Sequence, residues 1–104
     1  MAQFRELKSE TEFENFVDGG RRVVLKHSVS CPISHDLYRG ISSLDSDVGL
    51  VVVQTSRALS NYISEKTGIR HESPQALVFD DGDCVYAESH YDIEPGRIKE
   101  LING

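Results

Sequence analysis

The chain has 104 residues, of which 38% are hydrophobic and 27% are charged, and its formal net charge at pH 7 is −6. This length suits one domain over residues 1–104 with a core of its own, and the negative charge argues against nucleic acid as a partner, because phosphate binding needs a basic surface. No apolar run approaches the roughly 20 residues of a membrane span and the first residues lack the apolar stretch of a signal peptide, so we expect a cytoplasmic protein with no membrane partner.

The first half of the chain predicts two helices around a strand. Ser9-Glu10-Thr11-Glu12 is typical of a capping box, and apolar residues at helical spacing follow it until a pair of glycines ends the helix. Residues 22–27 predict a buried strand. Pro32 suits the first position of a second helix of about three turns, which makes Cys31 its N-cap. A short edge strand is also expected near 4–7.

The second half predicts three strands and two helices. Residues 49–54 are almost wholly apolar, as in a parallel strand covered on both faces, and a helix over 57–67 follows. The runs 75–80 and 84–89 flank an Asp-Gly turn and predict a hairpin, and Pro95 opens a last helix. The helix over 57–67 is expected to bury four side chains: Ala58, Leu59, Tyr62 and Ile63. This order predicts an α/β fold with a central mixed sheet flanked by helices on both faces.

Cys31 is the residue with the clearest chemistry. A thiol at the first turn of a helix faces unpaired N–H groups and the positive end of the helix dipole, and both favour the thiolate that attacks disulfides. Pro32 keeps these donors and the solvent arranged around the sulfur. Ser34 stands where a second cysteine would make a dithiol site, so the site is monothiol and takes its other thiol from elsewhere. Ser34 either donates to the thiolate or binds an N–H of the first turn.

Other residues near this site admit more than one interpretation. His27, Cys31 and His35 lie four positions apart, but zinc sites usually have four ligands, and no metal is expected. His35 either favours the thiolate when it is protonated or lies on a solvated helix surface. Cys84 begins a strand and is expected to be structural, because buried cysteines behave as small hydrophobic residues.

Two short segments resemble a known family. A reactive cysteine between strand and helix, followed 43 residues later by Pro74, is similar to the thioredoxin fold. Ser30-Cys31-Pro32-Ile33-Ser34 resembles the Thr-Cys-Pro-Ile-Ser active site of monothiol bacilliredoxins, with Ser30 in place of the threonine. His71-Glu72-Ser73-Pro74-Gln75 resembles the segment around that family's proline.

The resemblance implies a thioredoxin-like fold and removal of bacillithiol from mixed disulfides on client proteins. Cys31 would carry bacillithiol as a transient covalent adduct until a second low-molecular-weight thiol resolves it, with no tightly bound cofactor. We expect a monomer. Pro74 would face the sulfur and leave the Ser73 carbonyl and the Gln75 N–H to pair with an extended substrate. The sequence does not decide between the cis and trans isomers of the Ser73-Pro74 bond. Bacillithiol carries carboxylates, for which the best basic contacts are Arg70 and His71, with Arg39 next.

Three other functions fit the same residues. A glutaredoxin-like monothiol reductase would use glutathione or another small thiol in place of bacillithiol. A thioredoxin-fold module for redox sensing or binding would be modified at Cys31 without turnover. Iron–sulfur binding, which is known among monothiol glutaredoxin-like proteins, is the fourth possibility.

Overall fold

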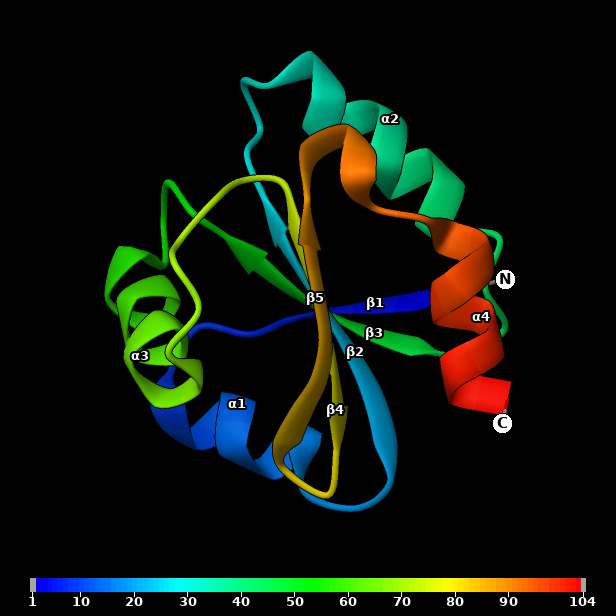
Figure 1. Cartoon of the computed structure of the whole chain (residues 1–104). Helices are drawn as coiled ribbons and strands as arrows, with labels where there is room; N and C mark the ends of the chain where they lie inside the picture. The colour runs from blue at the N-terminus through cyan, green and yellow to red at the C-terminus, as the bar shows by residue number, and fades with distance from the viewer. Residues whose placement is uncertain (1, 104) are drawn as a thin grey trace.

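Five strands form one sheet in the order β1-β3-β2-β4-β5, and helices cover both of its faces (Figure 1). The computed structural model describes residues 2–103. The strands are β1 (Gln3–Glu6), β2 (Arg21–His27), β3 (Asp47–Val52), β4 (Gln75–Asp80) and β5 (Asp83–Ser89). The helices are α1 (Glu10–Val17), α2 (Pro32–Ile41), α3 (Arg57–Thr67) and α4 (Pro95–Asn103), with a 3-10 turn η1 (His90–Asp92). No helix in this part of the chain is long and apolar enough to cross a membrane.

The sheet is mixed, as the order of elements predicts. β1 and β2 both pair with β3 in parallel, whereas β4 is antiparallel to β2 and β5 is antiparallel to β4. The edge strand expected near 4–7 is confirmed as β1. β3 starts two residues earlier than predicted because Asp47 and Val48 pair with β1, and it ends at Val52, which leaves Gln54 in a turn.

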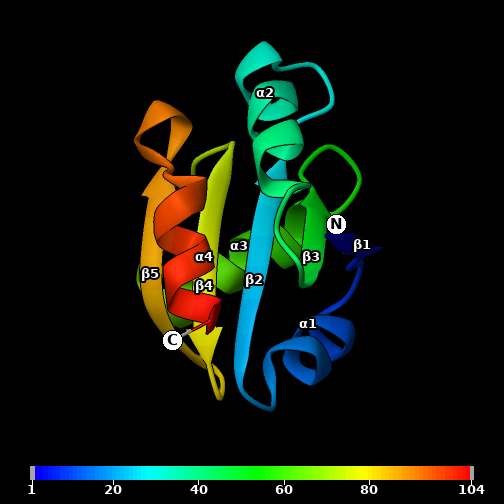
Figure 2. The same ribbon diagram turned by 90° about the vertical axis from the view of Figure 1, so that its right-hand side faces the viewer.

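The two faces of the sheet carry separate apolar cores. Leu37 and Ile41 of α2 and Ile98 of α4 pack on one face, and α1 and α3 pack on the other, as Figure 2 shows from the side. Gly49 of β3 lies under this second layer, where a Cβ would come within 2.7 Å of Leu7 and 2.9 Å of Phe16.

Most of the predicted helix and hairpin boundaries are confirmed. Asp81 and Gly82 have φ angles of 50° and 88°, the two positive values that a tight hairpin turn between β4 and β5 needs. Gly20, between α1 and β2, forms two hydrogen bonds with this turn. Its N–H donates to an Asp81 carboxylate oxygen at 2.6 Å, and its carbonyl accepts the Asp81 N–H at 3.0 Å. α3 spans the predicted residues, but the expected burial of Ala58 is wrong. The helix is turned so that Ser60, which is 1% exposed, faces the sheet instead.

Four connections meet at one end of the sheet. β2 and β3 are parallel, so the segments that follow them, 28–31 and 53–56, leave from the same end. β4 is antiparallel to β2, so the segment 68–74 that precedes it reaches the same end, and β5 finishes there before η1. In open α/β sheets, ligands bind outside the carboxyl ends of the parallel strands. This end therefore holds the candidate site.

Candidate active site

Cys31 occupies the position that the sequence predicts for it. It is the half-buried N-cap of α2, with extended backbone angles, and Pro32 is the first helical residue. The sulfur does not accept a full capping hydrogen bond in this geometry. The Ser34 N–H nevertheless lowers the pKa of Cys31, with smaller contributions from the Ile33 N–H and the Ser34 hydroxyl, while partial burial opposes them. The thiolate is therefore favoured by the start of α2.

Ser34 connects the start of α2 to the end of β2. Its side chain is 0% exposed, and its oxygen accepts the N–H of Ser28 at 3.2 Å. The hydroxyl also favours the Cys31 thiolate as a hydrogen-bond donor. Ser34 thus combines donation to the sulfur with acceptance of an N–H, but that N–H belongs to Ser28, before the helix, and not to the first turn as the alternative predicted.

The segment before Cys31 is fixed from two sides. Gln54 donates to the Ser28 hydroxyl at 2.7 Å and accepts the Val29 N–H at 3.3 Å. His35 donates its Nε2–H to the Val29 carbonyl at 2.9 Å, so its ring faces the backbone of this segment rather than the sulfur. Sequence reasoning missed Gln54; the only available signal was a polar residue directly after an apolar strand.

The rings of His27 and His35 pack against each other. His27 is 7% exposed and its ring centroid lies 5.5 Å from that of His35, at 83° between the planes. Burial, with the neighbouring charge of His35, lowers the pKa of His27. Within residues 2–103, no three His, Cys, Asp or Glu side chains are grouped in a way that would hold a metal ion.

Cys84 is the second residue of β5, and β5 finishes at the site. Cys84 therefore lies at the opposite end of the sheet from Cys31. It is half-buried, donates to the Tyr86 carbonyl at 3.4 Å and pairs with Phe79 across the hairpin. Burial raises its pKa. Both cysteines are free thiols, and of the two only Cys31 has a lowered pKa.

The segment 68–74 ends in a cis peptide bond between Ser73 and Pro74. Pro74 is buried and its carbonyl accepts the His90 N–H at 3.0 Å. Ser73 is half-buried and makes no hydrogen bond to another described residue, so its pairing with a client stays a prediction. Gln75 is 2% exposed and pairs with Lys26 on one side and Ser89 on the other. This double pairing contradicts the expectation that its N–H is free for a client.

Lys26 is buried and contacts the middle of segment 68–74. Lys26 is 0% exposed, and its ammonium donates to the Ser60 carbonyl at 3.0 Å and to Nδ1 of His71 at 3.3 Å. Ser60 Oγ lies 2.8 Å from the same nitrogen. Burial lowers the pKa of Lys26 to about 8. Burial and the charges of Lys26 and Arg57 lower the pKa of His71. Sequence reasoning missed Lys26, although a lysine directly after three apolar residues of a buried strand was a visible signal.

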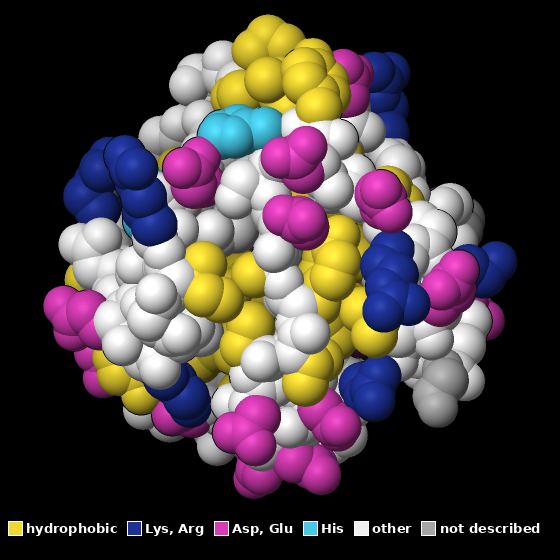
Figure 3. All heavy atoms as spheres, in the orientation of Figure 1, with side chains coloured by type: hydrophobic (Ala, Val, Ile, Leu, Met, Phe, Trp, Pro, Cys, Tyr) yellow, Lys and Arg dark blue, Asp and Glu magenta, His cyan; other side chains and the backbone are white. Residues whose placement is uncertain are grey.

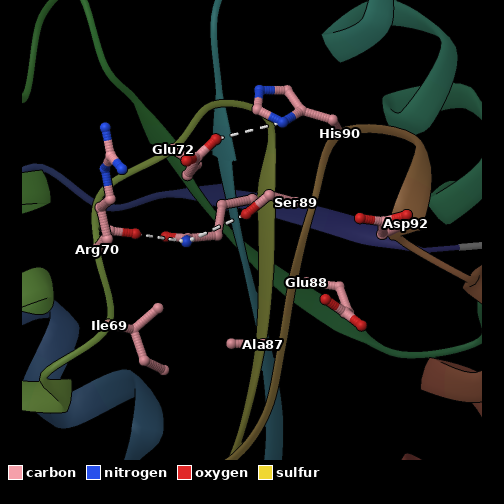
Figure 4. A pocket seen from close by; sticks show the side chains of 9 residues that line it. Ile69, Arg70, Glu72, Ala87, Glu88, Ser89, His90 and Asp92 are labelled. Atoms are coloured by element: carbon pink, nitrogen blue, oxygen red, sulfur yellow. Dashed lines mark hydrogen bonds and ion pairs between the residues drawn. The ribbon is translucent and has the colours of Figure 1, made fainter.

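An open cavity of about 400 Å³ lies between segment 69–75 and β5 (Figure 4). Three carboxylates line it, from Glu72, Glu88 and Asp92, together with Arg70 and His90, and Glu72 pairs with His90 at 3.2 Å. The Arg70 side chain points away from Ala87 at the other wall, while its carbonyl accepts from Gln75 at 2.9 Å. Arg39, the remaining candidate for a basic contact, pairs with Asp36 of its own helix at 2.6 Å.

Comparison with known proteins places this geometry among thiol proteins. A family model described as monothiol bacilliredoxin BrxC matches residues 5–98. A solved structure whose assignment as an oxidoreductase with a thioredoxin fold is provisional is 36% identical, covering 94% of this chain and 92% of that one, with a TM-score of 0.89. A mutant thioredoxin from Halobacterium salinarum NRC-1 is 18% identical over 97% of this chain and 88% of its own, with a TM-score of 0.77. Mitochondrial thioredoxin 3 from Saccharomyces cerevisiae is 15% identical over 96% and 93%, with a TM-score of 0.76. The last two share the fold alone.

Proposed function

The chain belongs to the monothiol bacilliredoxin family, and from this premise we propose that it removes bacillithiol from mixed disulfides on other proteins. Membership, together with the oxidoreductase neighbour, makes it a thiol–disulfide oxidoreductase with a thioredoxin fold. The observation that carries the proposal is the contrast between its two thiols: Cys31 lies at a helix start with a lowered pKa, whereas Cys84 is embedded in the sheet with a raised one.

In the first step, the Cys31 thiolate attacks the bacillithiol sulfur of the mixed disulfide. A new disulfide forms between Cys31 and bacillithiol, the old disulfide breaks, and the client leaves as a thiolate that takes a proton from solvent. The Ser34 hydroxyl and the N–H groups of Ile33 and Ser34 stabilise the attacking thiolate before the reaction. The charge moves to the client sulfur, and no net electrons are consumed.

In the second step, a thiol from another molecule attacks the bacillithiol sulfur carried by Cys31. This attack releases Cys31 as a thiolate and yields a disulfide between bacillithiol and the incoming thiol, whose proton goes to solvent. Ser34 in place of a second cysteine suits this order, because a neighbouring thiol would divert the adduct into an internal disulfide. We propose that the reaction needs no tightly bound cofactor and takes place in the cytoplasm, where free thiols persist.

The test is the intact mass of the reduced protein after it is mixed with a bacillithiolated client, beside a Cys31→Ala control. Transfer of one bacillithiol to the wild-type protein, with none to the control, supports the proposal. Absence of transfer while Cys31 still alkylates readily would overturn it. Glutathionylated client in a parallel sample separates a bacillithiol enzyme from a glutaredoxin-like one, and an adduct that forms without client release would indicate a sensing module.

A further inference from the structure

Three basic residues lie in or beside segment 68–74, and one of them, Arg70, also lines the cavity. Arg57 opens α3, Arg70 and His71 lie in the segment, and the charge of Arg57 reaches His71. Figure 3 shows Lys and Arg side chains grouped at one edge of this face with a carboxylate side chain beside them, while hydrophobic side chains occupy its middle. The chain carries 17 acidic residues, yet neither arginine forms an ion pair with a described residue.

The buried Lys26 fixes how His71 presents its ring. An ammonium only donates hydrogen bonds, so Nδ1 of His71 accepts from Lys26 and must be unprotonated. A neutral His71 therefore carries its proton on Nε2, at the other side of a ring whose residue is exposed. The result is an N–H donor held in a defined direction, on a residue that the charge of Arg57 reaches and that directly follows Arg70 in the chain.

Lys26 has no carboxylate partner among the described residues, although the charge of Glu72 acts on its neighbour His71. Lys26 is fully buried, and its two partners are a carbonyl and an imidazole rather than a carboxylate. A buried cation without an anion is costly, and proteins usually avoid it. An anion supplied from outside would offset that cost, and the planar fork of arginine matches a carboxylate well.

We propose that Arg57, Arg70 and His71 form a carboxylate-binding face for the small thiol that Cys31 removes, with Lys26 as the positioning residue behind His71. The face lies at the end of the sheet from which segment 28–31 and Cys31 also leave. This inference rests on the proposed function, because it names the part of the substrate that selects the small thiol. It adds Arg57 and Lys26 to the basic contacts that the sequence indicates.

The test compares two mixed disulfides of one client cysteine, one with mercaptosuccinate, which has two carboxylates, and one with the neutral 2-mercaptoethanol. We expect the wild-type protein to have the higher kcat/KM for the anionic disulfide. Arg57→Gln and Arg70→Gln should each lower the ratio of the two kcat/KM values about two- to fivefold, as for a surface ion pair, and the wild-type ratio should fall in high salt. Arg97→Gln, whose arginine pairs with Glu100 on α4, is the matched control and should keep the wild-type ratio. One ratio shared by all four proteins would overturn the inference.

The source of the carboxylate is tested with the symmetric disulfides of the same two thiols, without a client. If the ratio of the two kcat/KM values still depends on Arg57 and Arg70, the carboxylate that the face binds belongs to the small thiol. Loss of that dependence assigns it to the client and overturns our assignment. If the arginines govern this ratio but no bacillithiol is taken from a client, the choice of bacillithiol is wrong and the carboxylate-binding face stands. If bacillithiol is transferred from a client at a rate that depends on neither arginine, the proposed function stands and the carboxylate-binding face is wrong.

Nuclear magnetic resonance of His71 tests the role of Lys26. The nitrogen signals of the wild-type protein should show an unprotonated Nδ1 and a protonated Nε2, and Lys26→Met should remove this preference. A mercaptosuccinate adduct on Cys31 should raise the pKa of His71, because a nearby carboxylate favours the imidazolium, whereas a mercaptoethanol adduct should not. Equal pKa values in the two adducts would contradict the inference.

Discussion

Replacement of Lys26 by methionine should change the pH dependence of stability in a way that few other substitutions would. Burial lowers the pKa of Lys26 from 10.5 to about 8. At about 1.4 kcal/mol per unit, the charged lysine costs the folded state about 3 kcal/mol at pH 7, where both states are protonated. Between pH 8 and 10.5 the unfolded state binds more protons, so stability from this group rises with pH. About 2.5 kcal/mol of the cost is recovered between pH 7 and pH 10.

Methionine of similar length removes the charge and also two hydrogen bonds, to Ser60 and His71, each worth about 1 kcal/mol. Lys26→Met should therefore be more stable than wild type by roughly 1 kcal/mol at pH 7 and less stable by roughly 1.5 kcal/mol at pH 10. Urea unfolding at a series of pH values measures this difference, and titrations common to both proteins cancel in it. Lys99→Met, which removes an exposed lysine of α4, should follow the wild-type curve. A difference between Lys26→Met and wild type that stays constant from pH 7 to pH 10 would refute the reasoning.

Three further substitutions test the site and the core. Cys31→Ser should abolish release of client thiol with the fold intact by circular dichroism, whereas Cys84→Ser should keep most activity; a folded but inactive Cys84 variant would contradict the monothiol mechanism. Ser34→Ala should raise the pKa of Cys31, measured as an upward shift in the pH profile of alkylation, and should cost about 1–3 kcal/mol in urea unfolding, because a buried N–H loses its acceptor; an unmoved profile would exclude the hydroxyl from activation. Gly49→Ala should destabilise the protein by about 1–3 kcal/mol, because its Cβ would overlap Phe16, and an unchanged unfolding midpoint would show that the α1 layer yields without cost.

The elements and the position of Cys31 at the start of α2 were predictable because their signals are local. The capping box, Pro32 after Cys31, and the Asp-Gly turn each specify backbone geometry within a few residues, and these boundaries agree with the structure. Burial on α3 was less predictable. Ala58 is apolar but exposed, while Ser60 is buried and its carbonyl accepts from Lys26, a contact across 34 positions.

The residues that support the site were missed because their partners are far away in the chain. Gln54 reaches Ser28 across 26 positions, and Lys26 reaches His71 across 45. Neither pairing has a sequence period or a motif, and each depends on which loops the topology brings to one end of the sheet. The same limit explains Gln75, whose place in the interior of the sheet follows from strands on both of its sides.

The two hydrogen bonds between Gly20 and Asp81 join the turns at the end of the sheet opposite Cys31. These two hydrogen bonds hold the turns together, and the described groups that act on the Cys31 thiol lie at the other end of the sheet. A tether attached there would leave the reactive face turned toward solvent. The protein is therefore suited to immobilisation through these two turns, with Cys31 left facing the solution.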